Sequence, residues 1–316
     1  MKILSRCFFI HTLILFLVSG CITGQEIRVV ITDSGLGGLA VMDTISKKLE
    51  VSGYYKKVDM VFVNALFDSD LGYNALESRQ AKIDTFDRVL RAVERKFSPD
   101  IIIIGCNTLS VLYKETGFVQ ETDIVVEGIV DPGVGLIYDH LSADENSVVI
   151  ITGTETTISE DSHRKALLEK GISDERIITQ ACPELQSYIE RDPDGEDTEM
   201  LIDYYVSEAI EQLPDEVGPI YLSLNCSHYG YSEKLWRKAF AEEGVGLKKI
   251  LNPNYVIGDV LFQDGCGQRH ANTEIVYSVY SKVDLRNRDS MVGVFRDRSP
   301  GIAEALSNYI LDEDLF

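Results

Sequence analysis

An internal repeat constrains the fold of this 316-residue chain more than any other feature. Two β-branched runs, 29–34 (VVITDS) and 149–154 (VIITGT), each lead into a turn with a hydroxyl residue, and they lie 120 positions apart. A second pair, 103–108 (IIGCNT) and 223–228 (SLNCSH), each leads into a turn with a cysteine, again 120 positions apart. Strand–turn–helix units resemble one another by chance, but the coincident thiols favour a true duplication. We therefore expect two halves related by a pseudo-twofold axis.

The distribution of apolar residues predicts an α/β fold. Short β-branched runs of strand length alternate with segments long enough for crossover helices. The strongest runs lie at 27–32, 59–63, 101–104, 147–151 and 220–224. The clearest helix spans 75–97 and ends at Ser98 and Pro99, where the proline discourages continuation. Because the strands are continuously apolar, we expect two lobes, each with a mostly parallel sheet flanked by helices.

The composition excludes several classes of protein. With 45% hydrophobic and 26% charged residues, the chain is neither disordered nor of low complexity. It carries 30 Lys and Arg against 51 Asp and Glu, a formal net charge of −21. No nucleic-acid partner is expected, because neutralising phosphates requires a basic face.

The first 21 residues have the pattern of a targeting segment. Lys2 and Arg6 precede an apolar run at 7–18 that is too short to span a bilayer in the mature protein. The sequence Leu-Val-Ser-Gly-Cys at 17–21 resembles a bacterial lipobox. We expect residues 1–20 to be a signal peptide and Cys21 to become the lipid-modified N-terminus of an exported lipoprotein, anchored to a membrane on the periplasmic or cell-surface side. The alternative is a plain signal peptide followed by a chance cysteine.

Two of the remaining four cysteines occupy equivalent places in the repeat. Four thiols in so long a chain, including Cys182 and Cys266, form no disulfide framework, and an isolated cysteine is most often a buried structural thiol. Cys106 and Cys226, however, each follow a predicted strand, where side chains point into a ligand crevice and helix N-termini lower thiol pKa values. Two thiols facing each other across that crevice suit stereoinversion, in which one removes a proton and the other delivers one to the opposite face.

Several motifs around these cysteines resemble one family. They are 33–39 (DSGLGGL), 106–108 (CNT), 128–134 (GIVDPGV), 153–158 (GTETTI), Cys182-Pro183 with Glu190 eight residues after the cysteine, and 225–229 (NCSHY), where Ser227 replaces the usual Thr. From the order and spacing of these motifs, the chain is identified as a member of the aspartate/glutamate racemase superfamily and is most similar to glutamate racemase. The resemblance covers nearly the whole chain from Ile27 onward.

This resemblance implies a cofactor-independent amino-acid racemase. Cys106 and Cys226 would be the two bases on opposite faces of the α-carbon, assisted by Asp33 in the first half and by His228 with Glu190 in the second. The substrate, a small amino acid, would be held by Ser34, Asn107, Thr108, Thr154 and Ser227. Assembly into a homodimer is also considered.

The resemblance further implies how the chain is divided. The first lobe would comprise 27–125 plus 246–316, the second lobe 126–245, and the active site would lie in the cleft between them. The C-terminal segment, with a strand at 275–280 and a helix at 300–310, fits a return to the first lobe. Relative motion of the lobes would gate access to the site.

Each proposed site residue also has a purely structural interpretation. Asp33 and Ser34 could cap the following helix, and His228 could be an ordinary turn histidine. Glu190 lies beside the acidic stretch 192–197, where a solvated surface role is plausible.

The chain departs from glutamate racemases near the expected substrate side chain. Instead of a Pro-Tyr-Gly turn, residues 67–74 read FDSDLGYN. Asp68 or Asp70 in that pocket would repel a glutamate side chain unless a cation compensates. Recognition of a side-chain carboxylate is therefore an open question, and export suggests an amino-acid pool other than cell-wall synthesis.

Two rival functions come from other classes. Residues 35–40 (GLGGLA) fit a dinucleotide-binding fingerprint, but the second strand ends at Asn64 without the acidic residue that binds ribose, and Asp33 would repel pyrophosphate. The stronger rival is a non-catalytic amino-acid-binding lipoprotein that kept the cleft and lost turnover. Oxidation of Cys106 and Cys226 to a disulfide would produce the same inactive state.

Overall fold

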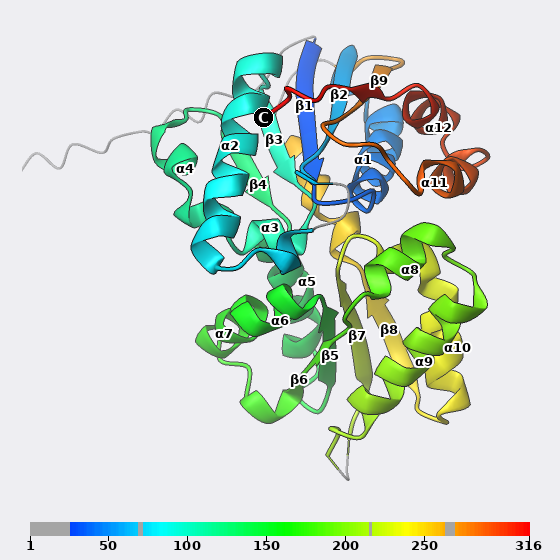
Figure 1. Ribbon diagram of the computed structural model, residues 1–316. Coiled ribbons are helices and arrows are strands. Elements are labelled where there is room, and N and C mark those ends of the chain that lie inside the picture. The colour runs from blue at the N-terminus through cyan, green and yellow to red at the C-terminus, as the bar shows by residue number, and fades with distance from the viewer. Residues whose placement is uncertain (1–25, 69–71, 215–216, 263–268) are drawn as a thin grey trace, which may run out of the picture.

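The computed structural model describes residues 26–68, 72–214, 217–262 and 269–316. Two α/β lobes are stacked one above the other, as Figure 1 shows. The first lobe holds a six-stranded sheet of order β10-β9-β2-β1-β3-β4, and the second a four-stranded sheet of order β6-β5-β7-β8. Every strand pair is parallel. The predicted α/β class with two parallel sheets is confirmed.

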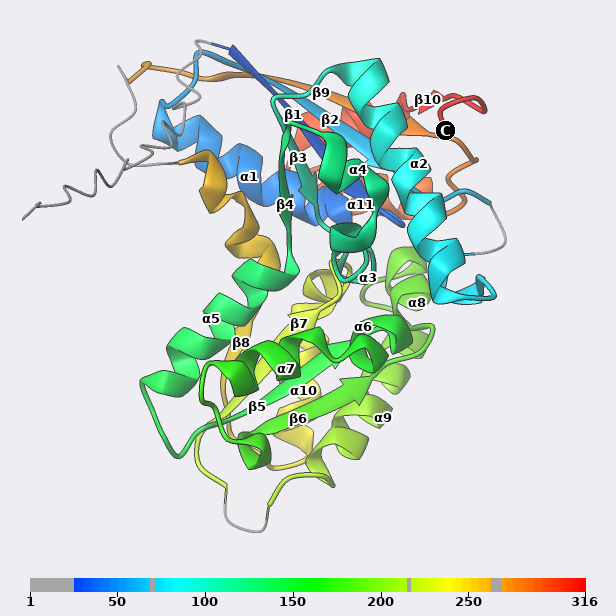
Figure 2. The same ribbon diagram turned by 90° about the vertical axis from the view of Figure 1, so that its left-hand side faces the viewer.

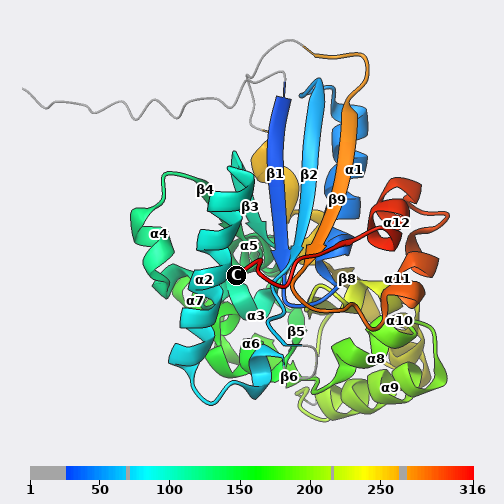
Figure 3. The ribbon, with the colours of Figure 1, turned by 45° about the horizontal axis from the view of Figure 1, so that its top comes forward.

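The first lobe is built from both ends of the described chain. Its strands are β1 (Glu26–Asp33), β2 (Lys57–Asn64), β3 (Ile101–Ile104), β4 (Val125–Gly128), β9 (Glu274–Ser281) and β10 (Ile310–Leu311). Its helices are α1 (Gly38–Ser52), α2 (Arg79–Phe97), α3 (Asn107–Ser110), α4 (Gly117–Glu121), α11 (Arg288–Phe295) and α12 (Pro300–Ser307), with 3₁₀ turns at η1 (Tyr73–Ala75) and η2 (Tyr113–Glu115). Figure 3 shows β9 lying beside β2, with α11 and α12 next to it.

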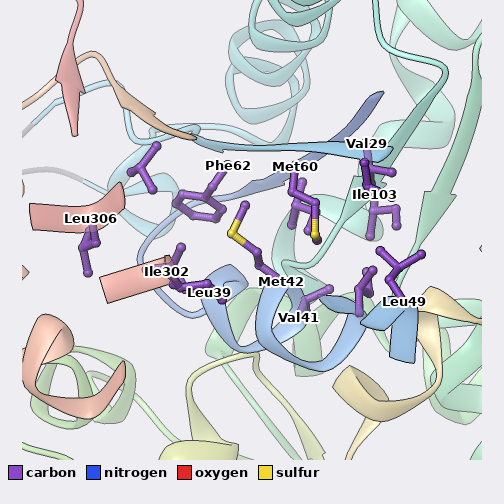
Figure 4. Packing of buried hydrophobic residues seen from close by; sticks show 14 of the residues in the cluster. Val29, Leu39, Val41, Met42, Leu49, Met60, Phe62, Ile103, Ile302 and Leu306 are labelled. Atoms are coloured by element: carbon purple, nitrogen blue, oxygen red, sulfur yellow. The ribbon is translucent and has the colours of Figure 1, made fainter. Parts of the chain in front are cut away.

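Alternate residues of β1 face two separate cores. Val29 and Ile31 point to one face of the sheet, where α1, α11 and α12 pack (Figure 4). Val30 points to the opposite face, which α2 covers. Because both faces are covered, the strand is apolar at consecutive positions, as the sequence predicted.

The second lobe repeats this plan. Its strands are β5 (Val148–Gly153), β6 (Ile177–Ala181), β7 (Ile220–Asn225) and β8 (Leu247–Leu251). Its helices are α5 (Val130–Ser142), α6 (Glu155–Glu160), α7 (Ser162–Glu169), α8 (Leu185–Arg191), α9 (Glu196–Ile210) and α10 (Glu233–Glu242), with 3₁₀ turns at η3 (Asp174–Arg176) and η4 (Tyr229–Ser232). Two further 3₁₀ turns, η5 (Pro253–Tyr255) and η6 (Ile257–Leu261), follow β8 on the return to the first lobe, whose core includes Ile257 and Leu261. Helices α5 and α7 cover one face of the sheet, and α8, α9 and α10 cover the other (Figure 2).

The duplication inferred from the sequence is visible in the strand order. The run β2-β1-β3-β4 in one sheet matches β6-β5-β7-β8 in the other. In this match β1 corresponds to β5 and β3 to β7, the two pairs that the 120-residue offset relates. Cys106 and Cys226 therefore follow equivalent strands.

Some predicted boundaries lie a few residues from the observed ones. Strand β4 closes the six-stranded sheet and β8 closes the four-stranded sheet, so the chain changes lobe after Gly128 and after Leu251 rather than at 126 and 246. The helix predicted at 75–97 begins at Arg79, because the Ser78 hydroxyl accepts the Ala81 amide as its N-cap. The helix predicted at 300–310 ends at Ser307, and Ile310 begins β10.

The targeting segment, Cys21, Asp70 and Cys266 lie outside the described residues. Within the part of the chain that is described, no helix combines the length and the apolarity needed to cross a membrane.

A buried carboxylate attaches the returning C-terminal segment to the rest of the first lobe. Asp43 in α1 is 0% exposed and accepts hydrogen bonds from Lys47 and Arg298, the latter at 2.5 Å from Nε. The Ser299 hydroxyl, just before α12, also donates to Asp43. Three donors thus compensate the burial of this charge and hold α12 against α1.

We predict that Asp43→Ala lowers the free energy of unfolding by about 3 kcal/mol, because it removes the common partner of three donors. Asp259→Ala is the matched control, since that carboxylate pairs with Lys48 at the surface with a 62% exposed side chain. The control should lose less than about 1 kcal/mol. Urea denaturation measures both, and equal losses would contradict a special role for Asp43.

Candidate active site

The carboxyl ends of equivalent strands from both lobes meet at one cavity of about 460 Å³. Strand β1 ends at Asp33 and β3 runs into Cys106, while β5 runs into Thr154 and β7 into Cys226. All ten residues predicted for the catalytic and substrate-binding site line this cavity: Asp33, Ser34, Cys106, Asn107, Thr108, Thr154, Glu190, Cys226, Ser227 and His228. The structure therefore brings together side chains that lie up to 195 positions apart in the sequence.

The first thiol, Cys106, is 6% exposed and lies immediately before α3. Its Sγ is 3.1 Å from the Ser34 hydroxyl. Burial, followed by the nearby charge of Asp33, raises the pKa of this thiol well above its ordinary value. This corrects the expectation that a helix N-terminus would lower the thiol pKa, since the four-residue helix is too short to offset the desolvation.

The second thiol, Cys226, is also 6% exposed but has a different partner. Its Sγ lies 3.7 Å from His228 Nδ1, and the opposite ring nitrogen, Nε2, lies 2.8 Å from Glu190 Oε2. Burial alone would lower the pKa of His228, but its contacts with Cys226 and Glu190 outweigh that effect and raise it well above 6.5. The contacts of His228 thus favour the protonated form of its ring on the Cys226 side of the cavity.

Glu190 is partly buried at the cavity, with 19% of its side chain exposed, and it bonds to groups of both lobes. Burial would raise the pKa of its carboxyl, but the hydrogen bond with His228 and the amide of Leu36 hold it below the ordinary value. Leu36 N–H donates to Oε2 at 3.0 Å, and Asn287 Nδ2 lies 3.4 Å from Oε1. The solvated role that its acidic neighbours suggested is therefore wrong.

Asp33 connects the two lobes across the base of the cavity. The Ser227 hydroxyl donates to Asp33 Oδ2 at 2.7 Å. Burial raises the pKa of Asp33 to about 6, although His228 and the Ser227 hydrogen bond both lower it. Neither Asp33 nor Ser34 caps α1, whose N-cap position is occupied by Gly37. Both side chains are instead available to the cavity.

Three hydroxyl residues form a second connection between the lobes. Thr108 Oγ1 lies 2.9 Å from Thr154 Oγ1, which is 3.0 Å from Thr157 Oγ1. Beside them, both side-chain polar atoms of Asn107 are buried and have no hydrogen-bond partner among the described residues. An unpaired buried amide costs about 1–3 kcal/mol, so this one is suited to pairing with a bound polar molecule.

The glycine-rich turn of the first lobe allows this close approach. A β-carbon at residue 37 would lie 2.3 Å from Ser227 Oγ and 2.5 Å from His228 Nδ1. At residue 35 it would lie 3.1 Å from His228 Cε1. The glycines that resemble a dinucleotide fingerprint are thus needed for contact with the second lobe, which occupies the space above the turn.

Sequence reasoning missed the contribution of the C-terminal segment. Asp284, Leu285, Arg286 and Asn287 also line the cavity, together with Gln186 and Arg191 of α8. No local motif marks the 284–287 stretch, and only the assembled sheet brings it to the site. Asp68, from the stretch that replaces the Pro-Tyr-Gly turn, lines the cavity as expected. Among the described residues, no group of three or more His, Cys, Asp and Glu side chains could hold a metal ion.

Known proteins with similar sequences include glutamate racemases. The glutamate racemase of Aquifex pyrophilus is 26% identical over 212 residues, which cover 67% of this chain and 74% of that protein. No protein-family model matches the chain. At this level of identity, relatives of this kind support the aspartate/glutamate racemase superfamily.

Solved structures show that the fold is the two-lobed fold of glutamate racemases. The Campylobacter jejuni enzyme aligns with a TM-score of 0.65 at 19% identity, covering 87% of this chain and 98% of that one. The Francisella tularensis enzyme, solved in complex with D-glutamate, aligns with a TM-score of 0.63 at 20% identity, covering 91% and 96%.

We predict that Asp33→Asn stabilises the protein increasingly as the pH rises from about 4 to 7. An acid whose pKa is raised from 3.8 to about 6 binds its proton more tightly in the folded state, so the wild-type protein loses stability across that window. The asparagine variant does not lose this stability. Between pH 4 and pH 7 its free energy of unfolding relative to the wild type should therefore increase by on the order of 3 kcal/mol. Urea denaturation of both proteins at pH 4 and pH 7 measures this, and a pH-independent difference would contradict the raised pKa.

Proposed function

We propose that the protein is a pyridoxal-independent amino-acid racemase that uses two cysteine bases. The observation that carries this proposal is the presence of two thiols in one cavity, each from an equivalent strand end of a different lobe. Because the strands belong to opposite lobes, the two sulfurs approach a bound molecule from opposite sides. Removal of the α-proton by one thiolate and delivery by the other thiol inverts the α-carbon.

The different surroundings of the thiols support an ordered proton transfer. Burial and Asp33 favour the protonated form of Cys106, whereas His228, held charged by Glu190, faces Cys226. We infer that in one direction Cys226 accepts the α-proton and Cys106 donates its own. The reverse reaction begins with the roles of the two sulfurs exchanged.

The rest of the cavity supplies what such a reaction needs. Without a cofactor that withdraws electrons, the α-proton is a weak acid, and the carbanion-like transition state must be stabilised by fixed polar groups in a dry site. Asn107, Thr108, Thr154, Ser34 and Ser227 are suited to hold the α-carboxylate and the ammonium group. Direct contacts between the lobes, Ser227 with Asp33 and Thr108 with Thr154, hold the two halves together at the cavity.

The substrate we propose is glutamate or a related amino acid. D-glutamate is the ligand of the related Francisella structure, which supports a small amino-acid substrate. The lining of the cavity includes charged side chains of both signs, namely Asp68, Asp284, Arg191 and Arg286, and these bear on the side-chain preference. A substrate panel therefore has to include neutral and acidic side chains.

We also propose that the enzyme works outside the cytoplasm as a lipoprotein anchored through Cys21. The basic residues, apolar run and lipobox-like sequence at the start of the chain support this location. Labelling of the expressed protein with a radioactive fatty acid tests it. Label should be incorporated into the wild-type chain and not into Cys21→Ala, whereas equal labelling would contradict the anchor.

The function is tested by following the α-proton in D₂O by NMR, with the full-length protein under reducing conditions and a panel of L- and D-amino acids. Deuterium incorporation accompanied by inversion would establish a racemase and identify its preferred side chain. Tight binding of an amino acid without exchange at its α-carbon would instead indicate a binding protein.

We predict that Cys106→Ser and Cys226→Ser each abolish racemisation without unfolding the protein. In each variant the remaining thiol can still remove a proton from one face, so slow α-proton exchange without inversion should persist for one enantiomer. The two variants should retain opposite enantiomers, because the sulfurs lie on opposite faces. Chiral chromatography with NMR measures both results, and full racemase activity in either variant would remove the two-base mechanism.

A further inference from the structure

Asn287 occupies a position at which its side chain would normally stabilise a helix. It is the N-cap residue of α11, where an asparagine side chain usually accepts a backbone N–H of the first turn. Here the side chain makes no such hydrogen bond. It lines the cavity instead, with Nδ2 at 3.4 Å from Glu190 Oε1.

The Glu190 carboxylate is consequently held by three donors that divide its two oxygens. His228 Nε2 and the Leu36 amide both contact Oε2, and Asn287 alone among them contacts Oε1. With both oxygens engaged, the plane of the carboxylate is fixed, and so is the orientation of the His228 ring that presents Nδ1 to Cys226.

Two of the three donors come from the opposite lobe. Glu190 and His228 belong to the second lobe, whereas Leu36 and Asn287 belong to the first. Helix α11 packs against α8, which carries Glu190, so the contact lies within an established interface. Tyr231 supports the same interface, because its hydroxyl donates to the Leu36 carbonyl at 3.1 Å.

We propose that Asn287 is a positioning residue, which orients Glu190 and through it His228 and Cys226 when the two lobes are closed. This inference rests on the proposed racemase function. It assigns to the C-terminal segment a role in the proton transfer at Cys226 and none at Cys106. The Cys226 side of the site is therefore fully assembled only in the closed arrangement.

The test compares Asn287→Ala with Asn287→Asp. Alanine removes the donor, whereas aspartate keeps the shape, replaces the donor by a second carboxylate facing Glu190, and remains a good helix N-cap. We expect kcat to fall by roughly 10-fold in the alanine variant and roughly 100-fold in the aspartate variant, with little change in KM. The melting temperature of the aspartate variant should be no lower than that of the alanine variant.

A merely structural role predicts the opposite order, with the isosteric aspartate variant more active than the alanine variant. That order, or wild-type kcat in both variants, would overturn the inference. Asn308→Asp is the control for the charge change, since Asn308 lies in the same lobe, is exposed, and donates to the Glu304 carbonyl at 3.0 Å. Its activity should equal that of the wild type.

A second measurement does not depend on turnover. Brief treatment of the full-length protein with iodoacetamide, followed by mass spectrometry, gives the ratio of alkylation at Cys226 to that at Cys106. In both Asn287 variants we expect this ratio to fall several-fold, because a misoriented His228 no longer faces Cys226. An unchanged ratio would contradict the inference, even in a protein that racemises nothing and so fails the proposed function.

Tyr231→Phe provides an independent variant of conservative size. It removes the hydroxyl that holds Leu36, the other first-lobe donor to Glu190, and leaves the ring packed against Phe295. The alkylation ratio should change in the same direction as in the Asn287 variants. An effect confined to Cys106 would overturn the proposed link from the first lobe to Cys226.

Discussion

The site depends on how closely the backbone of the first lobe approaches the second. At Gly37 there is no room for a β-carbon, because Ser227 and His228 fill the space, and at Gly35 a β-carbon would be in tight contact with His228. This proximity lets Ser227 reach Asp33 and lets the Leu36 amide reach Glu190. A larger side chain in the turn would separate the lobes and break both contacts at once.

Two thiols at equivalent strand ends have different neighbours. On the first-lobe side, Asp33 and burial disfavour the Cys106 thiolate. On the second-lobe side, contacts with Cys226 and Glu190 raise the pKa of His228 well above 6.5. Each half contributes one group to the surroundings of the other, since Ser227 binds Asp33 and Leu36 binds Glu190. The electrostatic difference between the thiols therefore arises mainly from residues of each thiol's own half, and Ser227 and Leu36 add hydrogen bonds across the interface.

Much of the fold was predictable because its signals are local. The apolar runs located the strands, and the shared offset of 120 residues paired β1 with β5 and β3 with β7. Cys106 and Cys226 followed because they sit directly after two of these strands, whereas Asp33, His228 and Glu190 were expected only from the family resemblance. The contribution of Asn287 was not predictable, since it depends on β9 joining β2 and on α11 packing against α8. The raised pKa of Cys106 was missed for a similar reason, because burial is a property of the assembled cavity and not of the helix that follows the cysteine.

The repeated strand order has a consequence for how such a site can originate. A chain with only one β2-β1-β3-β4 unit would carry one thiol and would need a second copy of itself to enclose a substrate. In such a symmetric pair both thiols would have identical neighbours, and every substitution would appear twice. Joining the two units in one polypeptide removes that restriction, so aspartate can be kept on one side and histidine with glutamate on the other. The chain is in effect a tethered dimer whose halves have been free to specialise.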